Sequence, residues 1–253
     1  MRQQARSLST EPDDKAEGSA RRELIVERDG KSLYQSDKPD LLIQEFGSPE
    51  PSNVNKFKKK RSVGSIRNEI SCYLFEYLEG FHIPTCFVGK LSSSQMMIKR
   101  VDLFPLSVKV FNSPSEALAG RLGITQKTNL DFPIIEHYYA SGKANSSWVN
   151  EYHVYALDVA TPEEFKGINR LTAKVNAVLR GLCDRRQLAL SDLHLTFGRW
   201  KAQIVLADEL SPTNCHFLDL AKEDPSQRDR FQVDSPNSEE ALSELCDRLM
   251  LKV

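Results

Sequence analysis

One stretch of the chain changes from a helical to an alternating pattern, and this change limits most strongly the folds open to its 253 residues. The stretch opens with Thr161-Pro162-Glu163-Glu164, which has the N-cap hydroxyl, the first-position proline and the third-position acid of a capping box. Apolar residues follow at helical spacing, at Phe165, Ile168, Leu171, Val175, Val178 and Leu182. This pattern predicts the longest helix of the chain.

The residues after this helix alternate between apolar and polar. The apolar side chains of one face are Leu193, Leu195 and Phe197, and the polar ones of the other face are Asp192, His194 and Thr196. After a turn at Gly198–Lys201, residues 204–206 return as a partner strand that leads to Asp208 and Glu209. A hairpin next to a long helix predicts a mixed α/β lobe in the second half of the chain. A last helix is predicted from about Ser238.

The first half is dominated by strand patterns. Residues 24–26 and 31–34 flank the turn dipeptide Asp29-Gly30, and residues 41–46 form a further apolar run. A helix is predicted from about Ser65 to Gly80, and strands are predicted near residues 85–91, 95–101 and 106–111. These elements predict an N-terminal lobe built on an antiparallel sheet with one inserted helix.

Composition excludes several classes of protein. The net charge is −1, which gives no general attraction to nucleic acid or to an anionic membrane, and no apolar run reaches the roughly 20 residues that span a bilayer. Residues 1–22 are polar and lack the apolar segment of a signal peptide, so we expect a disordered tail. Five cysteines without a CxxC pair indicate reduced thiols in a cytoplasmic protein.

Acidic residues at the ends of the predicted hairpin suggest a site. Asp208 ends one strand, beside a strand that presents Asp192, His194 and Thr196 on its polar face. Carboxylates placed in this way commonly hold Mg²⁺ against nucleotide phosphates, because Mg²⁺ prefers oxygen ligands. An Asp at a strand end is also a common turn or cap residue, so the local pattern alone leaves both interpretations open.

A series of motifs, in order along the chain, resembles the SAICAR synthetase family (phosphoribosylaminoimidazole-succinocarboxamide synthase). The motifs are Pro39-Asp40-Leu41-Leu42-Ile43-Gln44-Glu45-Phe46, Ile83-Pro84-Thr85, Arg121-Leu122-Gly123-Ile124, Val149-Asn150-Glu151, Phe197-Gly198, Ala207-Asp208-Glu209-Leu210-Ser211-Pro212 and Asp229-Arg230-Phe231. The resemblance implies an α+β fold with a kinase-like antiparallel β lobe, an α/β lobe and an ATP cleft between them. We place the first lobe at residues 23–110 and the second at residues 111–253.

The resemblance also implies an activity. Enzymes of this family join a carboxylated imidazole nucleotide to aspartate and split ATP to ADP. A carboxylate is a poor electrophile, and its phosphorylation gives an acyl phosphate that an amine can attack. Positioning and charge neutralisation then supply most of the catalysis. The implied partners are a small carboxylate and an amine rather than a nucleic acid or a membrane, and a homo-oligomer is compatible with the sequence.

The ATP side of the family pattern is largely kept. The second lysine of the family's glycine-lysine hairpin is matched by Lys31, whereas the first is replaced by Asp29. Lys99 matches the lysine of the motif V-K-[KR]-[VL], and Asp208 matches the aspartate of D-E-[FLI]-S-P. The resemblance therefore implies that Lys31 and Lys99 bind ATP phosphates and that Asp208 ligates Mg²⁺, with ATP and Mg²⁺ as cofactors.

The substrate side departs from the family pattern. A family lysine is replaced by His194 and a metal-side glutamate by Thr196, and three family arginines are replaced by Phe111, His216 and Gln232. In the motif G-x-[IV]-N-N, Gly64 and Asn68 persist but the first asparagine is Arg67. The residues expected to line the substrate pocket are Asn112, His194, Ser211, His216 and Arg230. Because a buried phosphate and carboxylate need several donors, these losses predict poor binding of the family's nucleotide.

Two functional hypotheses follow from this division. The first is an ATP-dependent carboxylate–amine ligase with a less anionic substrate, in which Lys31, His194 and Asp208 are catalytic. The second is an inactive member of the family that serves as a binding or scaffolding protein, supported by Asp29 and Thr196 in place of a lysine and a glutamate.

Two other uses of polar residues remain open from the sequence. His194, Asp208, Cys215 and His216 are candidate transition-metal ligands, although adjacent Cys215-His216 is poor ligand spacing. The basic run Lys56–Arg61 is a candidate contact for a phosphate, a nucleic acid or a protein, or else a solvated loop.

Overall fold

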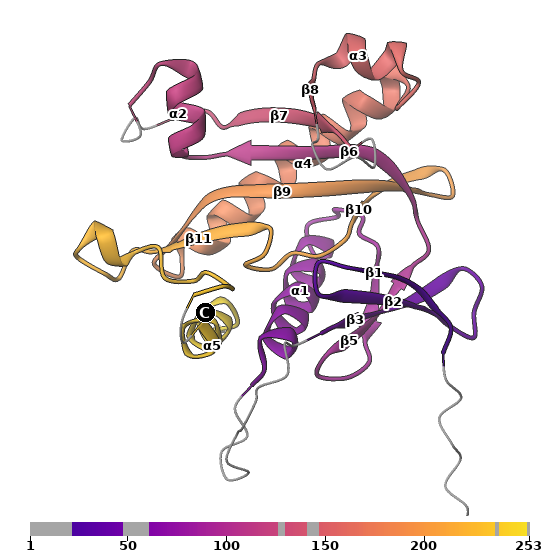
Figure 1. Cartoon of the computed structure of the whole chain (residues 1–253), viewed down its shortest axis with the longest axis horizontal. Helices are drawn as coiled ribbons and strands as arrows, with labels where there is room; N and C mark the ends of the chain where they lie inside the picture. The colour runs from indigo at the N-terminus through magenta and orange to yellow at the C-terminus, as the bar shows by residue number, and fades with distance from the viewer. Residues whose placement is uncertain (1–21, 48–60, 126–129, 141–146, 236–237, 252–253) are drawn as a thin grey trace, which may run out of the picture.

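The protein is built on two antiparallel sheets, the first from strands within residues 24–99 and the second from strands within residues 102–219 (Figure 1). The structure is a computed structural model, and it describes residues 22–47, 61–125, 130–140, 147–235 and 238–251. The first sheet has the strand order β1-β2-β3-β5-β4. Its strands are β1 (Leu24–Arg28), β2 (Lys31–Gln35), β3 (Leu41–Phe46), β4 (Phe87–Lys90) and β5 (Gln95–Lys99).

The turn between β1 and β2 has the backbone that its sequence predicts. Asp29 and Gly30 have φ angles of 54° and 67°, so both lie in the left-handed region. Hairpins favour two such residues in succession because their twist matches that of the flanking strands. The turn places Lys31 at the start of β2, opposite Phe46 of β3.

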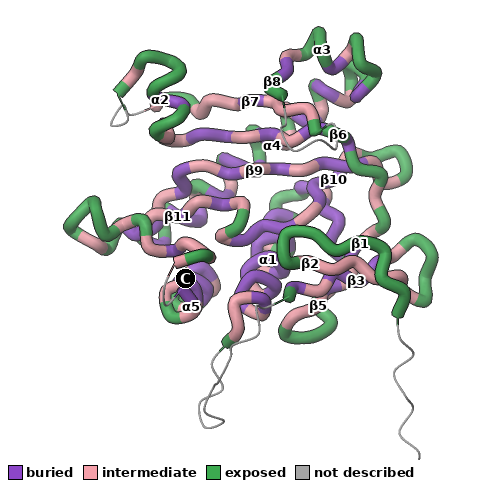
Figure 2. The backbone as a smooth tube through the Cα atoms, in the orientation of Figure 1, coloured by how far each residue is buried: buried purple, intermediate pink, exposed green. Residues whose placement is uncertain are grey.

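Helix α1 (Val63–Glu79) packs against this sheet and supplies many residues of the hydrophobic core, which is shared by both sheets. Ser62 caps its N-terminus by accepting a hydrogen bond from the backbone of Ser65, and Gly80 caps its C-terminus, as predicted. Helix α5 (Ser238–Leu249) packs against α1, so the end of the chain contacts the first lobe (Figures 1 and 2). The predicted start of this last helix is confirmed.

The second sheet has the order β10-β9-β6-β7-β8, and β11 pairs with β9. Its strands are β6 (Asp102–Phe111), β7 (Ile134–Tyr139), β8 (Ser147–Val149), β9 (Leu188–Trp200), β10 (Gln203–Ala207) and β11 (Cys215–Asp219). The strand at residues 106–111, which the sequence predicts within the N-terminal lobe, is part of β6 and belongs to this sheet. The reason is that Val108 and Val110 of β6 pair with β9 and are buried in its core.

Helix α4 (Pro162–Asp184) covers the apolar face of β9. Its capping box between Thr161 and Glu164 is formed as predicted. The alternation along β9 is also confirmed, since Leu193, Leu195 and Phe197 are buried while His194 and Thr196 are partly exposed. The remaining helices are α2 (Glu116–Leu122), α3 (Glu151–Ala156) and the 3₁₀ turn η1 (Pro225–Gln227).

The α+β class is confirmed. The predicted tail lies outside the described residues except for Arg22, and so does the Lys56–Arg61 run except for Arg61, whose guanidinium pairs with Asp247 at 2.8 Å. No helix in the described part of the chain combines the length and hydropathy that a membrane crossing requires.

Candidate active site

The two sheets meet where β10 ends. The backbone N–H of Cys86, just before β4, donates to Leu206 O at 2.7 Å, and the N–H of Leu206 donates to Pro84 O at 2.9 Å. This contact brings the residues after β10 directly beside the first sheet. Asp208 follows with a φ of 71°, a left-handed conformation that Asp tolerates better than most residues. Its carboxylate thereby points toward the β1–β2 hairpin.

Lys31 and two acids form an ion cluster at this junction. The Nζ of Lys31 contacts Asp208 Oδ1 and lies 3.2 Å from Glu209 Oε1. The side chains of Lys31 and Glu209 are 12% and 2% exposed, whereas that of Asp208 is 39% exposed. Burial by itself would lower the pKa of Lys31, but the two carboxylates outweigh it and raise that pKa. Lys31 is therefore a firmly protonated cation.

Arg67 of α1 is a second cation of the cluster. The motif comparison identifies it only as the replacement of an asparagine and does not predict its place here. Its Nη2 donates to Glu209 Oε1 at 2.8 Å and to the carbonyl of Asp29 at 3.2 Å. Its guanidinium lies 5.3 Å from the ring centre of Phe46. Lys31, Arg67, Asp208 and Glu209 together form a balanced group of two cations and two anions.

Lys99 lies on the other side of the junction. Its Nζ donates to Thr85 O at 2.7 Å, and its backbone N–H donates to Cys86 O. Cys86 is fully buried, and burial raises the pKa of its thiol to about 12. The structure thus brings Lys31 and Asp208 into contact and ties Lys99 to the adjoining backbone.

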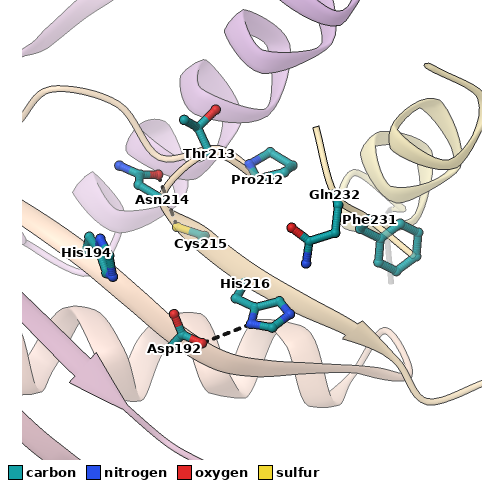
Figure 3. Close-up of a pocket in the computed structure, with 9 residues that line it drawn as sticks. All are labelled: Asp192, His194, Pro212, Thr213, Asn214, Cys215, His216, Phe231 and Gln232. Carbon is teal, nitrogen blue, oxygen red and sulfur yellow. Dashed lines mark hydrogen bonds and ion pairs between the residues drawn. The ribbon is translucent and has the colours of Figure 1, made fainter. Parts of the chain in front are cut away.

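A cavity of about 260 Å³ opens beside the same loop, on the polar face of β9 (Figure 3). Its lining residues are Asp192, His194, Pro212, Thr213, Asn214, Cys215, His216, Phe231 and Gln232. A larger cavity of about 890 Å³ shares Pro212, Thr213 and Gln232 with it and reaches Gly30 and Arg67. The two cavities therefore extend from the β1–β2 turn and Arg67 to the polar face of β9.

His216 is held between two carboxylates in the smaller cavity. Its Nδ1 lies 2.9 Å from Asp192 Oδ2 and its Nε2 lies 2.9 Å from Asp229 Oδ1. The hydrogen bond with Asp192, aided by Asp229 and opposed by burial, raises the pKa of His216 to about 9. His216 is therefore an imidazolium at neutral pH, and both of its N–H groups are used within the protein.

His194 has the opposite charge state. It lies on β9 in register with Lys109 of β6. Burial lowers the pKa of His194, and the positive charge of Lys109 lowers it further. His194 lines the cavity, and a neutral imidazole can accept a proton.

The sequence matches a known protein family over most of its length. The family model for SAICAR synthetase matches residues 26–248. The chain belongs to the SAICAR synthetase family. Among its relatives, the phosphoribosylaminoimidazole-succinocarboxamide synthase of Thermoanaerobacter sp. (strain X514) is 34% identical over 90% of this chain and 98% of the relative. That of Chlorobium chlorochromatii (strain CaD3) is 36% identical over 91% and 98%.

Solved structures of the SAICAR synthetase family share the fold. The phosphoribosylaminoimidazole-succinocarboxamide synthase of Ehrlichia chaffeensis superposes with a TM-score of 0.77 at 27% identity, covering 90% of this chain and 98% of the other. A SAICAR synthetase in complex with ADP superposes with a TM-score of 0.76 at 29% identity, covering 90% and 97%. The fold and the family inferred from the motifs are confirmed.

The residues expected in the substrate pocket of a SAICAR synthetase fall into two groups. His194 and His216 line the smaller cavity. Asn112 instead exchanges amide hydrogen bonds with Asn176 at 2.8 Å, and Ser211 is buried with its hydroxyl 3.1 Å from Glu209 Oε2. Arg230 donates from Nε to Asp219 Oδ2 at 2.8 Å. The pocket role of these last three residues stays a prediction.

Three positions carry an arginine in the SAICAR synthetase pattern and another residue in this chain. They differ from one another in burial and in contacts. Phe111 is buried at the end of β6, in register with Asp192. Gln232 lines both cavities, and its side-chain amide donates to Asp229 Oδ1. The position of His216 keeps a positive charge, which the sequence had suggested was lost.

The transition-metal alternative finds no support. Among the described residues, no group of three or more His, Cys, Asp or Glu side chains could hold a metal ion. Cys215 is buried, and burial raises the pKa of its thiol well above the ordinary value. A buried neutral thiol is a poor metal ligand.

Proposed function

We propose that this chain is an ATP- and Mg²⁺-dependent carboxylate–amine ligase that uses a less anionic substrate than the nucleotide of SAICAR synthetases. Membership of the family and the similarity to a SAICAR synthetase in complex with ADP support the nucleotide part. The contact between Lys31 and Asp208 supports it further, because a lysine beside a metal-binding carboxylate is suited to a magnesium nucleotide. Lys99 would assist in neutralising the phosphates.

The residues present fit a magnesium ion at Asp208. Its carboxylate is partly exposed at the end of a strand, and oxygen ligands of this kind suit a hard cation that retains several waters. Asp208 would hold the ion against the phosphate oxygens, and the bound ion would supply charge neutralisation. Lys31 would then move its ammonium group from Asp208 toward the nucleotide.

The proposed reaction has two steps. A substrate carboxylate oxygen attacks the γ-phosphorus of ATP, which forms an acyl phosphate and releases ADP. The amine nitrogen then attacks the acyl carbon, so that the C–N bond forms and the C–O bond to phosphate breaks. The nitrogen must lose a proton, and His194 would accept it, because it lines the cavity and its imidazole is neutral.

The state of His216 carries the proposal of an altered substrate. Asp192, His216 and Asp229 together have a net charge of −1, since the imidazolium is flanked by two carboxylates. An arginine at this position would have N–H donors left for a phosphate. His216 has only two N–H groups, and both already donate to Asp192 and Asp229. The cavity therefore favours a neutral or cationic group, such as an amine, over a phosphate.

The test compares substrates in an assay of ADP formation. We expect little turnover with the carboxylated imidazole nucleotide and aspartate, and faster turnover when uncharged or cationic amines are offered with carboxylates that lack a phosphate. Asp208→Asn should abolish this activity, whereas the exposed Asp247→Asn should retain it. Efficient turnover of the carboxylated imidazole nucleotide with aspartate would overturn the proposal of an altered substrate.

An inactive binding protein is the second candidate, and one observation favours it. Lys31 and Arg67 already neutralise Asp208 and Glu209, and Asp29 stands where the family hairpin has a further lysine. Nucleotide binding without ADP formation, whatever carboxylate and amine are added, would support this candidate over the ligase.

A further inference from the structure

Arg67 of helix α1 is a buried cation. Only 5% of the residue is exposed, and its Nε has no hydrogen-bond partner among the described residues. A buried charge of this type requires a paired opposite charge. Arg67 finds it in Glu209, which lies 142 positions later in the chain.

Glu209 has both carboxylate oxygens engaged within the protein. Oε1 faces Arg67 Nη2 at 2.8 Å and Lys31 Nζ at 3.2 Å, and Oε2 accepts the hydroxyl of Ser211 at 3.1 Å. A divalent cation bound to Oε1 would lie about 2 Å from that oxygen and hence close to the guanidinium. Repulsion between the two cations opposes such a complex, because little water is present to screen it.

Asp208 differs from Glu209 in its exposure and in its cationic partner. Its side chain is 39% exposed, and its partner is the flexible ammonium group of Lys31. A lysine can turn away toward a phosphate more readily than a guanidinium that is fixed on several sides. Arg67 is fixed by Glu209, by the carbonyl of Asp29 and by the ring of Phe46.

The hairpin turn is built over this arginine. A Cβ atom at Gly30 would lie 3.1 Å from Arg67 Nη1, so the turn leaves just enough space for the guanidinium. Arg67 therefore links the turn that carries Lys31 to the loop that carries Asp208 and Glu209.

We propose that Arg67 is a built-in counter-ion for Glu209 that limits the nucleotide site to one divalent cation, held at Asp208. Arg67 is thus a positioning residue: it fixes the hairpin and removes Glu209 from metal binding. This inference rests on the nucleotide site of the proposed function and concerns its metal content.

Counting bound Mn²⁺ by electron paramagnetic resonance tests the inference on the intact chain. With a non-hydrolysable ATP analogue, we expect one Mn²⁺ for each nucleotide bound to the wild-type protein. Two Mn²⁺ ions for each nucleotide would overturn the inference and leave the proposed function in place. A failure to bind the nucleotide at all would instead overturn the proposed function.

Variants test the role of Arg67 in setting the number of Mn²⁺ ions per bound nucleotide. Arg67→Asn should raise it from one to two by freeing Glu209, and the double variant Arg67→Asn/Glu209→Gln should return it to one. Arg61→Asn removes a positive charge from the exposed pair with Asp247 and should leave the count at one. A count of one in Arg67→Asn would contradict the proposal.

Glu209→Gln tests the same point if Arg67→Asn does not fold. The amide oxygen can still accept a hydrogen bond from Arg67. If Glu209 does not bind the metal, the loss of its carboxylate should leave Mn²⁺ binding unchanged. The count should therefore stay at one, with a change of less than about threefold in Mn²⁺ affinity, which corresponds to under about 0.7 kcal/mol. Loss of the bound Mn²⁺ in Glu209→Gln would show that Glu209 is a ligand and overturn the proposal.

Discussion

At the scale of single residues, His216 and His194 have the same side chain and opposite charge states. They lie on neighbouring strands of one sheet and line one cavity. Two carboxylates hold a proton on His216, whereas burial and Lys109 keep His194 neutral. The difference comes from the neighbouring charged groups and from burial, and only His194 is left with a neutral imidazole for the proton transfer of the proposed reaction.

The raised pKa of His216 predicts a pH-dependent contribution to stability. The pKa is about 9 in the folded protein and about 6.5 in an unfolded chain. The stabilisation is therefore complete below about pH 6.5 and is lost as the pH rises through about 9. We expect the wild-type protein to exceed His216→Gln in unfolding free energy by about 1–2 kcal/mol at pH 6, after allowance for solvent screening.

Urea unfolding at a series of pH values measures this difference, which should vanish above about pH 9. Titration of the imidazole by NMR provides a direct control. An NMR pKa of His216 near the unfolded value, or a stability difference that stays constant with pH, would contradict the assignment.

At the scale of elements, local signals specify the helices and strands well. The capping box at Thr161, the turn at Asp29-Gly30 and the alternation along β9 all have the structure that their sequences predict. Their common cause is short-range chemistry, such as a side chain that caps its own helix. The pairing of β6 with β9 was not predicted, because it depends on strands separated by some 80 residues of intervening chain.

The contact between α1 and β3 predicts a strict requirement for glycine. A Cβ atom at Gly64 would lie 2.6 Å from Phe46 O and 2.8 Å from Gly47 O, so the backbone would have to move. We expect Gly64→Ala to lower the free energy of unfolding by about 2–3 kcal/mol, the upper part of the range for overpacking.

Gly120→Ala is the matched control, since nothing lies within 4 Å of the added Cβ and the residue belongs to helix α2. This change should be neutral or stabilise the protein by up to about 1 kcal/mol. Denaturant unfolding of both variants checks the pair, and equal stabilities would be inconsistent with the close approach at Gly64.

At the scale of the whole molecule, the junction between the sheets brings together the residues of the proposed nucleotide site. The hydrogen bonds of Leu206 with Pro84 and Cys86 join the segment before β4 to the edge strand β10 of the second sheet. They bring the β1–β2 hairpin, the start of α1 and the loop after β10 to one place. A ligand at this junction would contact both lobes, so its binding should stabilise the whole fold.

Mg-ATP should therefore raise the melting temperature. A ligand at about 100 times its Kd adds about 2.7 kcal/mol, which for a chain of this size corresponds to a shift of roughly 5–10 °C. Differential scanning fluorimetry with Mg-ATP, ATP with a chelator and Mg²⁺ alone separates the contributions of nucleotide and metal. An unchanged melting temperature at millimolar Mg-ATP would argue against a working nucleotide site.

The sequence by itself determined the long helix α4, the β1–β2 turn, the helix caps and the family, and it named Lys31 and Asp208 as separate candidate site residues, because these features depend on neighbouring residues and on motif order. It did not predict strands β7, β8 and β11 or the contact between Lys31 and Asp208. Only the tertiary structure decided that Arg67 pairs with Glu209 and that His216 carries a charge. Pairing of buried ions and protonation of a histidine depend on the distance to groups far along the chain, and the fold alone sets those distances.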